Sequence, residues 1–485
     1  MSKSQPSSEK GHDYVSFVVT KAHAAYYFKN PISAKAHENA AACMPGGNTR
    51  TSLHAEPFPL SIISGTGKEL TSADGHTYID FLGEYSAGLL GHSNPRIEEA
   101  LSKTMKSGWN FGGATLYEKK LARKVTARFS KGGMDLVRFT NSGTEANMMA
   151  IGAAIAWTGR KKILVFSSGY HGGTFIFTMA MCKWYHSKTS STPPLNINLP
   201  HEFVAAPFNN LKETKIIIES LPKDSLAAIL IEPVQGSSGC RPALPEFLTY
   251  LRETCEKLGA LFIVDEVMTS RLGPSGYLET LGLRADLITL GKWIGGGMSF
   301  GAFGGRGDIM EMFDPARSTK GLMHAGTFNN NVFSMSAGIV ALDIYNEQKL
   351  KEFNARGDRM KAGITKVLFD TGIYSQEHAE YLKDVREIDS FEDDVRLYTG
   401  NDEIVNLPKV LISSRGTMLN LRFTSPQAGA WHNLYYHYML ANGMYLASRG
   451  YTPMNLEISD EDVDRFVSLV KEFLIIHLDE IKNQD

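Results

Sequence analysis

Short, continuously apolar segments recur through the middle of this chain, and they constrain its fold more than any other feature. Residues 162–166, 227–231, 260–264 and 287–290 are almost entirely apolar, and residues 145–157 are rich in alanine and methionine, as in a helix. Strands of this uniformly apolar kind are typical of a parallel sheet with both faces covered. We therefore predict an α/β fold: a mainly parallel sheet, flanked by helices and joined by right-handed crossovers.

The length of the chain predicts more than one domain. At 485 residues it exceeds the size at which a single core keeps growing. We predict a large domain over residues 80–335. Residues 1–79 and 336–485 are expected to combine into a smaller α+β domain, because their strand patterns, such as the hairpin at 60–70, are short and mixed. The charged, weakly periodic stretch 376–407 is predicted to be a surface insertion.

Composition excludes several classes of function. A net charge of −2 gives no reason to expect nucleic acid or an anionic membrane as a partner. No segment is apolar for long enough to span a bilayer, and residues 1–14 are polar, so a cytoplasmic location is expected. Cys43, Cys182, Cys240 and Cys255 lack metal-binding spacing, so no metal site is predicted and they are interpreted as reduced packing residues.

Two of the apolar strands end on chemically active residues. Asp265 follows the strand 260–264, and Lys292 follows the strand 287–290, shortly before three consecutive glycines. Sites in parallel sheets lie beyond the carboxyl ends of the strands, where these two residues would meet. An amine and a carboxylate are the pair that a pyridoxal phosphate enzyme needs. The amine forms a Schiff base, and the carboxylate keeps a proton on the pyridine nitrogen. We predict pyridoxal 5'-phosphate as cofactor, with Lys292 and Asp265 catalytic.

A phosphate-binding loop is predicted between a strand and the helix of residues 145–157. Ser142, Gly143 and Thr144 stand there, where a helix N-terminus offers free N–H groups and a favourable dipole to an anion. In isolation an ordinary Ser/Thr helix cap would explain this loop. Together with Lys292 and Asp265 in one α/β unit, cofactor binding is the better interpretation. Tyr170, after the next strand, offers a ring that could stack on the pyridine.

At these positions the chain resembles a class III aminotransferase of the fold-type-I pyridoxal phosphate family. The resemblance extends from about residue 44 to 458, with 376–407 as a departure. The motifs that carry it are Asp74-Gly75, Tyr78-Ile79-Asp80, Gly91-His92, Asn141-Ser142-Gly143-Thr144-Glu145-Ala146, Tyr170-His171-Gly172, Glu232-Pro233, Asp265-Glu266-Val267, Gly291-Lys292 and Gly326-Thr327.

The resemblance implies roles that spacing alone does not give. It places His171 and Glu232 among the cofactor-binding residues, with Glu232 organising the pocket rather than transferring protons. It implies a homodimer in which Thr327 reaches the cofactor phosphate of the neighbouring subunit. It also implies small amino and oxo acids as substrates, with Lys292 as the base that moves the substrate proton.

Two branches of the family compete. Glutamate-1-semialdehyde aminomutases, which are isomerases, are similar at 265–269 and 289–305 but not at 443–451. β-Amino acid aminotransferases, such as the β-phenylalanine enzymes, are similar at 44–50, at 326–331 and at Arg449-Gly450. We favour the second branch, and therefore transfer of an amino group from a β-amino acid to an oxo acid such as 2-oxoglutarate or pyruvate. The aminomutase remains the alternative, and a catalytically inactive structural homologue is a third.

Arginines are the expected ligands of the substrate carboxylates, because a guanidinium binds a carboxylate through two parallel hydrogen bonds. Arg50 lies in a Gly-Gly-Asn-Thr loop from which a side chain can reach a cleft. Arg415, just before a predicted strand, resembles the second carboxylate-binding arginine of the β-amino acid branch. Arg422 is the alternative for that second role.

Overall fold

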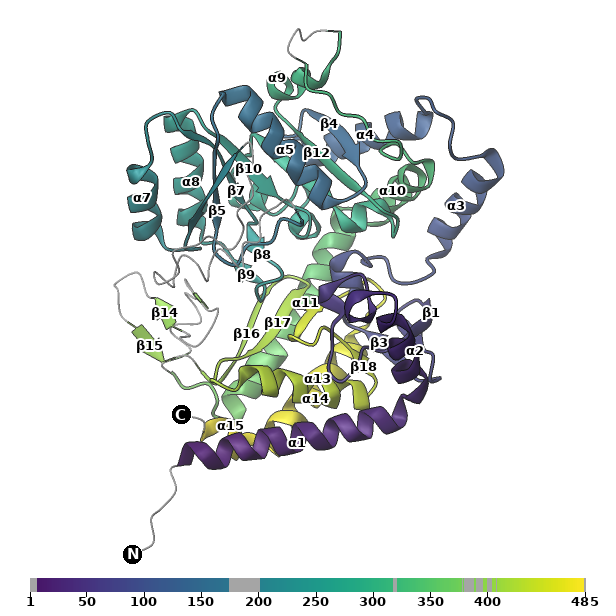
Figure 1. Cartoon of the computed structure of the whole chain (residues 1–485), viewed down its shortest axis with the longest axis vertical. Helices are drawn as coiled ribbons and strands as arrows, with labels where there is room; N and C mark the ends of the chain where they lie inside the picture. Colours follow the sequence, from purple (N-terminus) through teal and green to yellow (C-terminus); the bar gives the residue numbers. More distant parts are fainter. Residues whose placement is uncertain are drawn as a thin grey trace, which may run out of the picture. The chain divides into compact units, whose positions relative to one another are not determined.

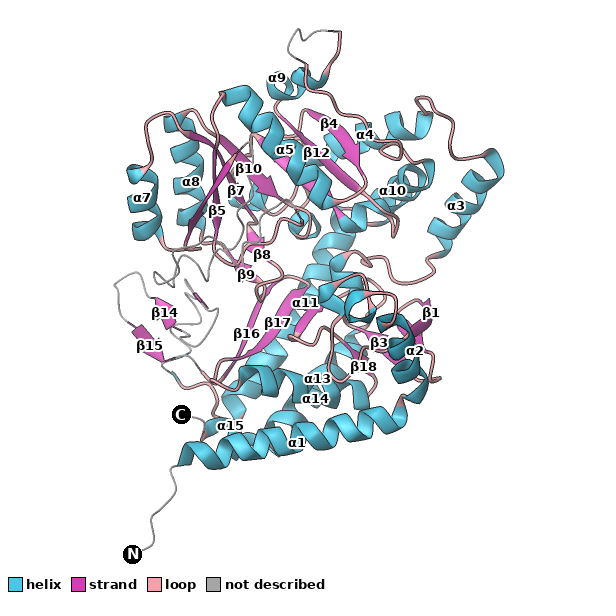
Figure 2. Ribbon diagram, in the orientation of Figure 1, coloured by secondary structure: helices cyan, strands magenta, loops and turns pink. Residues whose placement is uncertain are grey.

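The structure is a computed structural model that describes residues 7–173, 201–316, 321–376, 378, 388–389, 396–398, 404–406 and 408–483. The chain divides into two compact units (Figures 1 and 2). One is Pro95–Asn354, called here the sheet unit. The other combines Met1–Asn94 with Ala355–Asp485 and is called the terminal unit. The predicted boundaries at 79/80 and 335/336 stay predictions, and most of the predicted insertion 376–407 lies outside the described residues.

A seven-stranded mixed sheet forms the centre of the sheet unit (Figure 2). Its strands pair in parallel except β12, which runs antiparallel to both its neighbours. The predicted α/β fold is confirmed, and strands form at each of the predicted apolar segments. In spatial order the strands are β4 (Leu136–Thr140), β12 (Gly301–Gly305), β11 (Leu287–Gly291), β10 (Leu261–Asp265), β7 (Leu226–Ile231), β5 (Lys162–Phe166) and β6 (Glu202–Ala206).

The strand β12 was not predicted because glycine is depleted in strands. Its glycines are required by close backbone approach. A Cβ on Gly301 would lie 2.1 Å from the Ser142 carbonyl oxygen, and one on Gly305 would lie 2.0 Å from the Asp286 carbonyl oxygen. These contacts are sterically impossible, so only glycine fits. The Ser142 contact also places β12 directly against the loop predicted to bind phosphate.

Helices cover both faces of the sheet. Helix α5 (Gly143–Thr158) packs Ala146 and Ala150 against a core that includes Ile163 and Val165 of β5. Successive side chains of a strand point to opposite faces. Phe166, next along β5, instead meets Phe247 of α8 (Pro245–Leu258), with ring centroids 5.3 Å apart. The sheet is therefore buried on both sides, as its continuously apolar strands predict.

The terminal unit is built from both ends of the chain. Strands β1 (Ile62–Thr66), β2 (Glu69–Ser72) and β3 (Thr77–Asp80) form the predicted antiparallel hairpins, and β18 (Met444–Tyr445) adds to them in parallel. A second sheet contains β16 (Val410–Arg415), β17 (Met418–Phe423) and β19 (Tyr451–Pro453). Its helices include α1 (Ser7–Lys29), α2 (Pro31–Ala41), α13 (Ala428–Ala441), α14 (Asp460–Ile476) and α15 (Leu478–Lys482).

The remaining described elements complete the two units. They are helices α3 (Pro95–Ser107), α4 (Leu116–Phe129), α7 (Leu211–Ser220), α9 (Gly307–Met310), α10 (Val332–Ile344) and α11 (Glu347–Asp370), and strands β8 (Val234–Gln235), β9 (Arg241–Pro242), β13 (Ile388–Asp389), β14 (Arg396–Tyr398) and β15 (Ile404–Asn406). Within the described part of the chain, every helix is too short or too polar to cross a membrane.

The cysteines only partly follow the prediction that they are packing residues. Cys240 and Cys255 are buried, whereas Cys43 is exposed at the end of the α2 region, so a packing role is wrong for Cys43. Cys182 lies outside the described residues.

Candidate active site

Asp265, the last residue of β10, is a buried carboxylate with three hydrogen-bond donors. The backbone N–H of Val267 donates to Oδ1 at 3.0 Å. The amide Nδ2 of Asn147 and the ring Nδ1 of His171 both donate to Oδ2, at 2.8 Å and 2.9 Å. These bonds offset the cost of burying the charge. A carboxylate has about four acceptor directions, so one direction stays available for a donor on a bound group.

Lys292 follows β11, the strand next to the one that ends at Asp265. Strands β10 and β11 are parallel with Asp265 opposite Thr289, and Lys292 begins a short turn directly after β11 ends at Gly291. Its backbone φ is +53°, in the left-handed region that costs a side-chain-bearing residue about 1–2 kcal/mol. The predicted pair is therefore brought to one edge of the sheet, and the lysine stands in a strained turn.

The residue after the lysine fixes this turn. Trp293 is fully buried, and its indole Nε1 donates to the Ser270 hydroxyl at 2.9 Å. The Arg128 guanidinium carbon lies 4.9 Å from the centroid of the Trp293 ring, and the Tyr345 ring packs edge-on at 5.1 Å. Strained backbone persists only where the surroundings over-determine it, and the packing around Trp293 supplies that constraint.

The loop predicted to bind phosphate is the N-terminus of α5. The Ser142 hydroxyl accepts from the Glu145 N–H at 3.2 Å, and the Ser142 carbonyl accepts from the Ala146 N–H at 3.1 Å. Among the described residues no acceptor is recorded for the N–H groups of Gly143 and Thr144, and both stand at the positive end of the helix dipole. A Cβ on Gly143 would lie 2.8 Å from a methyl carbon of Val267, two residues beyond Asp265. The turn predicted to bind an anion and the buried carboxylate are thus adjacent, an arrangement that fits pyridoxal phosphate.

The other predicted cofactor residues occupy different environments. His171 is buried, and its bond to Asp265 places it behind the carboxylate. Tyr170 is exposed, and its backbone N–H donates to Glu232 Oε1 at 2.7 Å. Thr327 is exposed on the sheet unit. Cofactor contacts of these four residues remain predictions.

Glu232 is a second buried carboxyl group behind this edge of the sheet. Its pKa is raised to about 7, chiefly by burial; the His171 charge and the N–H groups of Tyr170 and Gly236 lower it, and the nearby Asp265 charge adds to the increase. The resemblance gave it an organising role, and these contacts are of that kind. With a pKa near neutral, the Glu232 carboxyl group is partly protonated at pH 7, so the charge it contributes depends on pH.

Two polar residues behind Asp265 escaped the sequence analysis. Asn147, on α5, donates to Asp265, and its Oδ1 accepts from the Thr289 hydroxyl at 2.7 Å. Both are buried, at 1% and 0% exposed. The available signal was an asparagine in an otherwise apolar helix, one turn after Gly143, and a threonine in an apolar strand.

Arg50 lies in the terminal unit, beside an acidic and an aromatic side chain. Its guanidinium forms an ion pair with Glu84, and its carbon lies 5.3 Å from the centroid of the Tyr85 ring. Glu84 and Tyr85 have left-handed φ of 48° and 52°, a strained turn of the kind found at binding sites. Burial raises the pKa of the Tyr85 hydroxyl, and the charges of Arg449 and Arg50 both oppose this shift. The charges of Arg50 and Arg449 therefore both act on the Tyr85 hydroxyl.

Arg415 and Arg422 stand in the same β16–β17 hairpin, but near its opposite ends. Arg415 donates to the Ser414 carbonyl at 3.2 Å. The pKa of Lys361 is lowered mainly by burial of its own side chain, and the charge of Arg415 lowers it further. Burial lowers the pKa of His432 to about 3, with the charges of Arg422 and then Arg449 acting in the same direction. The charges of Arg422 and Arg449 thus both act on His432, whereas that of Arg415 acts on Lys361.

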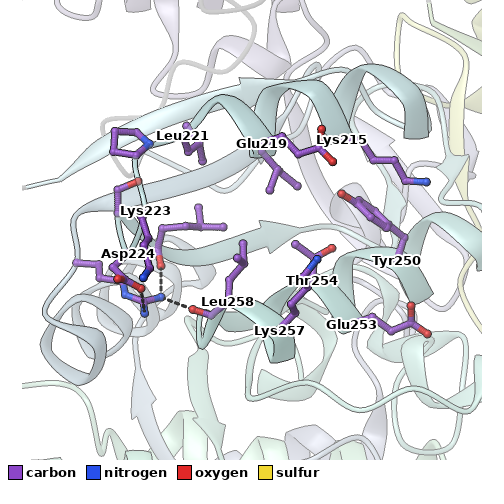
Figure 3. A pocket seen from close by; sticks show the side chains of 15 residues that line it. Lys215, Glu219, Leu221, Lys223, Asp224, Tyr250, Glu253, Thr254, Lys257 and Leu258 are labelled. Atoms are coloured by element: carbon purple, nitrogen blue, oxygen red, sulfur yellow. Dashed lines mark hydrogen bonds and ion pairs between the residues drawn. The ribbon is translucent and has the colours of Figure 1, made fainter.

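A cavity of about 640 Å³ lies at the opposite edge of the sheet, where β5 and β7 begin (Figure 3). Arg160 lines it and donates to the carbonyls of Leu226 and Leu258, at 3.0 Å and 2.6 Å, and pairs with Asp224 at 3.2 Å. None of the predicted site residues lines this cavity. Within the described ranges, no cluster of three or more histidine, cysteine or acidic side chains could bind a metal ion.

Comparisons with known proteins agree with the geometry. A family model described as aminotransferase class III matches residues 51–388. The beta-phenylalanine transaminase of Variovorax paradoxus is 38% identical over 464 residues, which cover 96% of this chain and 97% of the relative. The glutamate-1-semialdehyde 2,1-aminomutase of Methanosarcina acetivorans is 33% identical over 70% of this chain and 80% of its own.

Solved structures give the same result. The beta-phenylalanine aminotransferase from Variovorax paradoxus matches with a TM-score of 0.82 and 36% identity, covering 96% of this chain and 98% of that one. The predicted family resemblance is confirmed, and both predicted branches are among the similar proteins.

The environment of Glu232 generates a prediction about pH and stability. Its pKa rises from 4.5 in the unfolded chain to about 7 in the folded protein, so between these values the folded state binds more protons. The free energy of unfolding should therefore fall as pH rises through this window. Glu232→Gln cannot ionise at this position. We therefore expect its melting temperature, relative to that of the wild type, to increase as the pH rises from about 5 to about 8. A difference in melting temperature that is constant over this range would contradict the assignment.

Proposed function

The chain belongs to the class III aminotransferases, which use pyridoxal phosphate, and we propose that its amino donor is a β-amino acid. The acceptor would be an oxo acid such as 2-oxoglutarate or pyruvate. The observation that carries the proposal is the pair of arginines around Tyr85, which suits a substrate with an aromatic group and a carboxylate. The similarity to the beta-phenylalanine transaminase of Variovorax paradoxus supports the same donor class.

Residues of the sheet unit would hold the cofactor. Gly143 and Thr144 would bind its phosphate through their N–H groups, and Asp265 would accept the proton-bearing ring nitrogen through its remaining acceptor direction. When bound, pyridoxal phosphate supplies a ring that accepts electrons from the amino-bearing carbon of the substrate. Lys292 would be the amine that attaches to the cofactor. It would also take and return the proton at that substrate carbon.

Arg50 would bind the substrate carboxylate in place of Glu84. The Arg50 and Glu84 side chains are 43% and 55% exposed, and ion pairs of this kind contribute only about 0–1 kcal/mol. A substrate carboxylate can therefore displace Glu84 at little cost. Tyr85, fixed in the same turn, would then contact the side chain of the substrate.

Arg449 is our choice for the second carboxylate ligand. It acts on the same tyrosine hydroxyl as Arg50, whereas Arg415 faces Lys361. Arg422 shares the His432 ring with Arg449 and would support it electrostatically rather than bind substrate. The choice departs from the sequence interpretation, in which Arg415 came first.

The aminomutase function is the alternative, supported by the similarity to the Methanosarcina enzyme. An isomerase needs no external acceptor, so dependence on an oxo acid separates the two functions. A catalytically inactive homologue is disfavoured because Lys292, Asp265 and the loop at 142–144 are all in place.

We also propose that the chain acts as a homodimer in which Thr327 completes the partner's site. Thr327 stands beside exposed apolar side chains, including Phe328, and the neighbouring Asn330 amide donates to the Gly113 carbonyl at 3.2 Å. This bond joins the 326–331 segment to a second exposed apolar segment, with Trp109 and Phe111. Exposed aromatic side chains such as these are enriched at protein interfaces. The cytoplasmic location remains a prediction from the sequence.

The donor class can be tested through Arg50. With a β-amino acid such as β-phenylalanine, Arg50→Ala should cost about 2–5 kcal/mol of transition-state binding, because a desolvated carboxylate loses its partner. This corresponds to a loss of at least roughly thirty-fold in kcat/KM. Simple amines without a carboxylate should be converted almost unchanged. Arg284→Ala, at an exposed position of the sheet unit, is the control and should leave both rates intact.

The same assay separates the branches. The wild type should deaminate the β-amino acid continuously only when an oxo acid is supplied. Isomerisation of glutamate-1-semialdehyde without any acceptor, together with no reaction of any β-amino acid, would reject the proposal.

The choice between the arginines gives its own prediction. We expect Arg449→Ala to raise KM for the oxo acid by about tenfold or more, since one tenfold step is about 1.4 kcal/mol and a bidentate charged contact is worth at least that. Arg415→Ala should change it less than about threefold. The reverse order of the two effects in steady-state kinetics would restore the sequence interpretation.

The dimer proposal is testable by complementation. Thr327→Glu would place a negative charge beside the partner's phosphate site and should inactivate it, as Lys292→Ala should inactivate its own chain. Hybrid dimers of the two variants would contain one site with both Lys292 and Thr327, so mixing should restore activity. Thr327→Ser should remain active. Hybrids that form, as shown by sedimentation and differential tagging, but stay inactive would contradict the role of Thr327.

A further inference from the structure

We infer that Asn147 and Thr289 are positioning residues that determine which oxygen of Asp265 receives the cofactor's ring nitrogen. The inference rests on the proposed cofactor role of Asp265. It goes further by naming the two side chains, outside the predicted set, that orient and charge-stabilise this carboxylate.

The orientation of the Asn147 amide is fixed by its partners. Its Oδ1 accepts from the Thr289 hydroxyl at 2.7 Å. Its Nδ2 donates to Asp265 Oδ2 at 2.8 Å and to the His171 carbonyl at 3.2 Å. With the amide reversed, Nδ2 would face a hydroxyl and Oδ1 would face a carboxylate and a carbonyl oxygen. The two acceptor oxygens therefore fix the amide with its donor side toward Asp265, and the Thr289 hydroxyl completes this arrangement by donating to Oδ1.

Counting hydrogen bonds distinguishes the two carboxylate oxygens. Oδ2 of Asp265 accepts from both Asn147 and His171, which uses its two lone-pair directions. Oδ1 accepts only from the Val267 N–H among the described residues, so it keeps one direction open. The ring nitrogen would thus be accepted at Oδ1. Loss of Asn147 would open Oδ2 and remove the preference.

Asn147 also differs from His171, the other side-chain donor to Asp265, in that its amide carries no ionisable proton. The titratable neighbours of Asp265 are His171, through its ring nitrogen, and the buried carboxyl groups of Glu232 and Glu266. Glu266 accepts from Thr269 and from the N–H groups of Tyr277 and Leu278. A neutral amide donates in the same way whatever the protonation state of these groups, so its hydrogen bond to Asp265 does not depend on them.

The experiment compares Asn147→Leu and Thr289→Val with a matched control, Asn455→Leu. Asn455 is also fully buried and also uses both ends of its amide, toward the Asp80 carbonyl and the Glu457 N–H, but it lies in the terminal unit. The probe is the holoenzyme loaded with pyridoxal phosphate labelled with ¹⁵N in the ring. The nitrogen chemical shift reports ring protonation, and thermal unfolding reports stability.

We expect Asn147→Leu to shift the ring nitrogen toward its unprotonated value and to slow the single-turnover reaction with the amino donor at least tenfold. Thr289→Val, which loses only a hydroxyl, should do the same to a smaller extent. Asn455→Leu should lose stability with no change in either signal. A wild-type nitrogen shift in both site variants would overturn the inference.

The design remains informative if one variant or the donor assignment fails. Should Asn147→Leu not fold, Thr289→Val still decides, since valine is nearly isosteric with threonine. The nitrogen chemical shift is measured without substrate, so an incorrect assignment of the amino donor would affect only the single-turnover measurement. A nitrogen that is unprotonated already in the wild-type holoenzyme would instead reject the cofactor role of Asp265 itself.

Discussion

The buried charge of Asp265 is the constraint on which the rest of this site depends. A carboxylate at the end of a central strand, almost wholly removed from water, is unstable unless donors surround it. The fold supplies them from three directions: the turn after β10, helix α5 on one face of the sheet, and the loop after β5. The same helix begins with the N–H groups of Gly143 and Thr144, which have no acceptor among the described residues. One element, α5, therefore both supports the carboxylate and carries the proposed phosphate-binding turn.

Backbone strain is the second constraint. Lys292 stands in a left-handed conformation directly beyond β11, and the turn is held by the burial of Trp293 between Arg128 and Tyr345. The terminal unit uses the same principle at Glu84 and Tyr85, whose left-handed turn presents an acid and a ring to Arg50. In both places a left-handed backbone lies at or beside a residue for which a functional role is proposed, Lys292 in one unit and Arg50 in the other.

Much of this arrangement could be predicted from the sequence, for physical reasons that also set the limit. Continuous apolar runs identify buried strands, and strand ends identify Lys292 and Asp265, because these signals are local. The sequence did not reveal β12, because its glycines are required by close contacts with backbone atoms that are distant in the chain. Nor did it reveal Asn147 and Thr289, because a hydrogen bond between a helix and a strand leaves no periodic signal. The preference for Arg449 over Arg415 likewise depends on which side chains share Tyr85.

The most direct test of the central claim is the location of the cofactor attachment. The holoenzyme would be reduced with borohydride, digested, and mapped by mass spectrometry for the pyridoxyl phosphate modification. The account predicts a single modified peptide, with the label on Lys292. A label on any other lysine would contradict the convergence of Lys292, Asp265 and the start of α5 on one site.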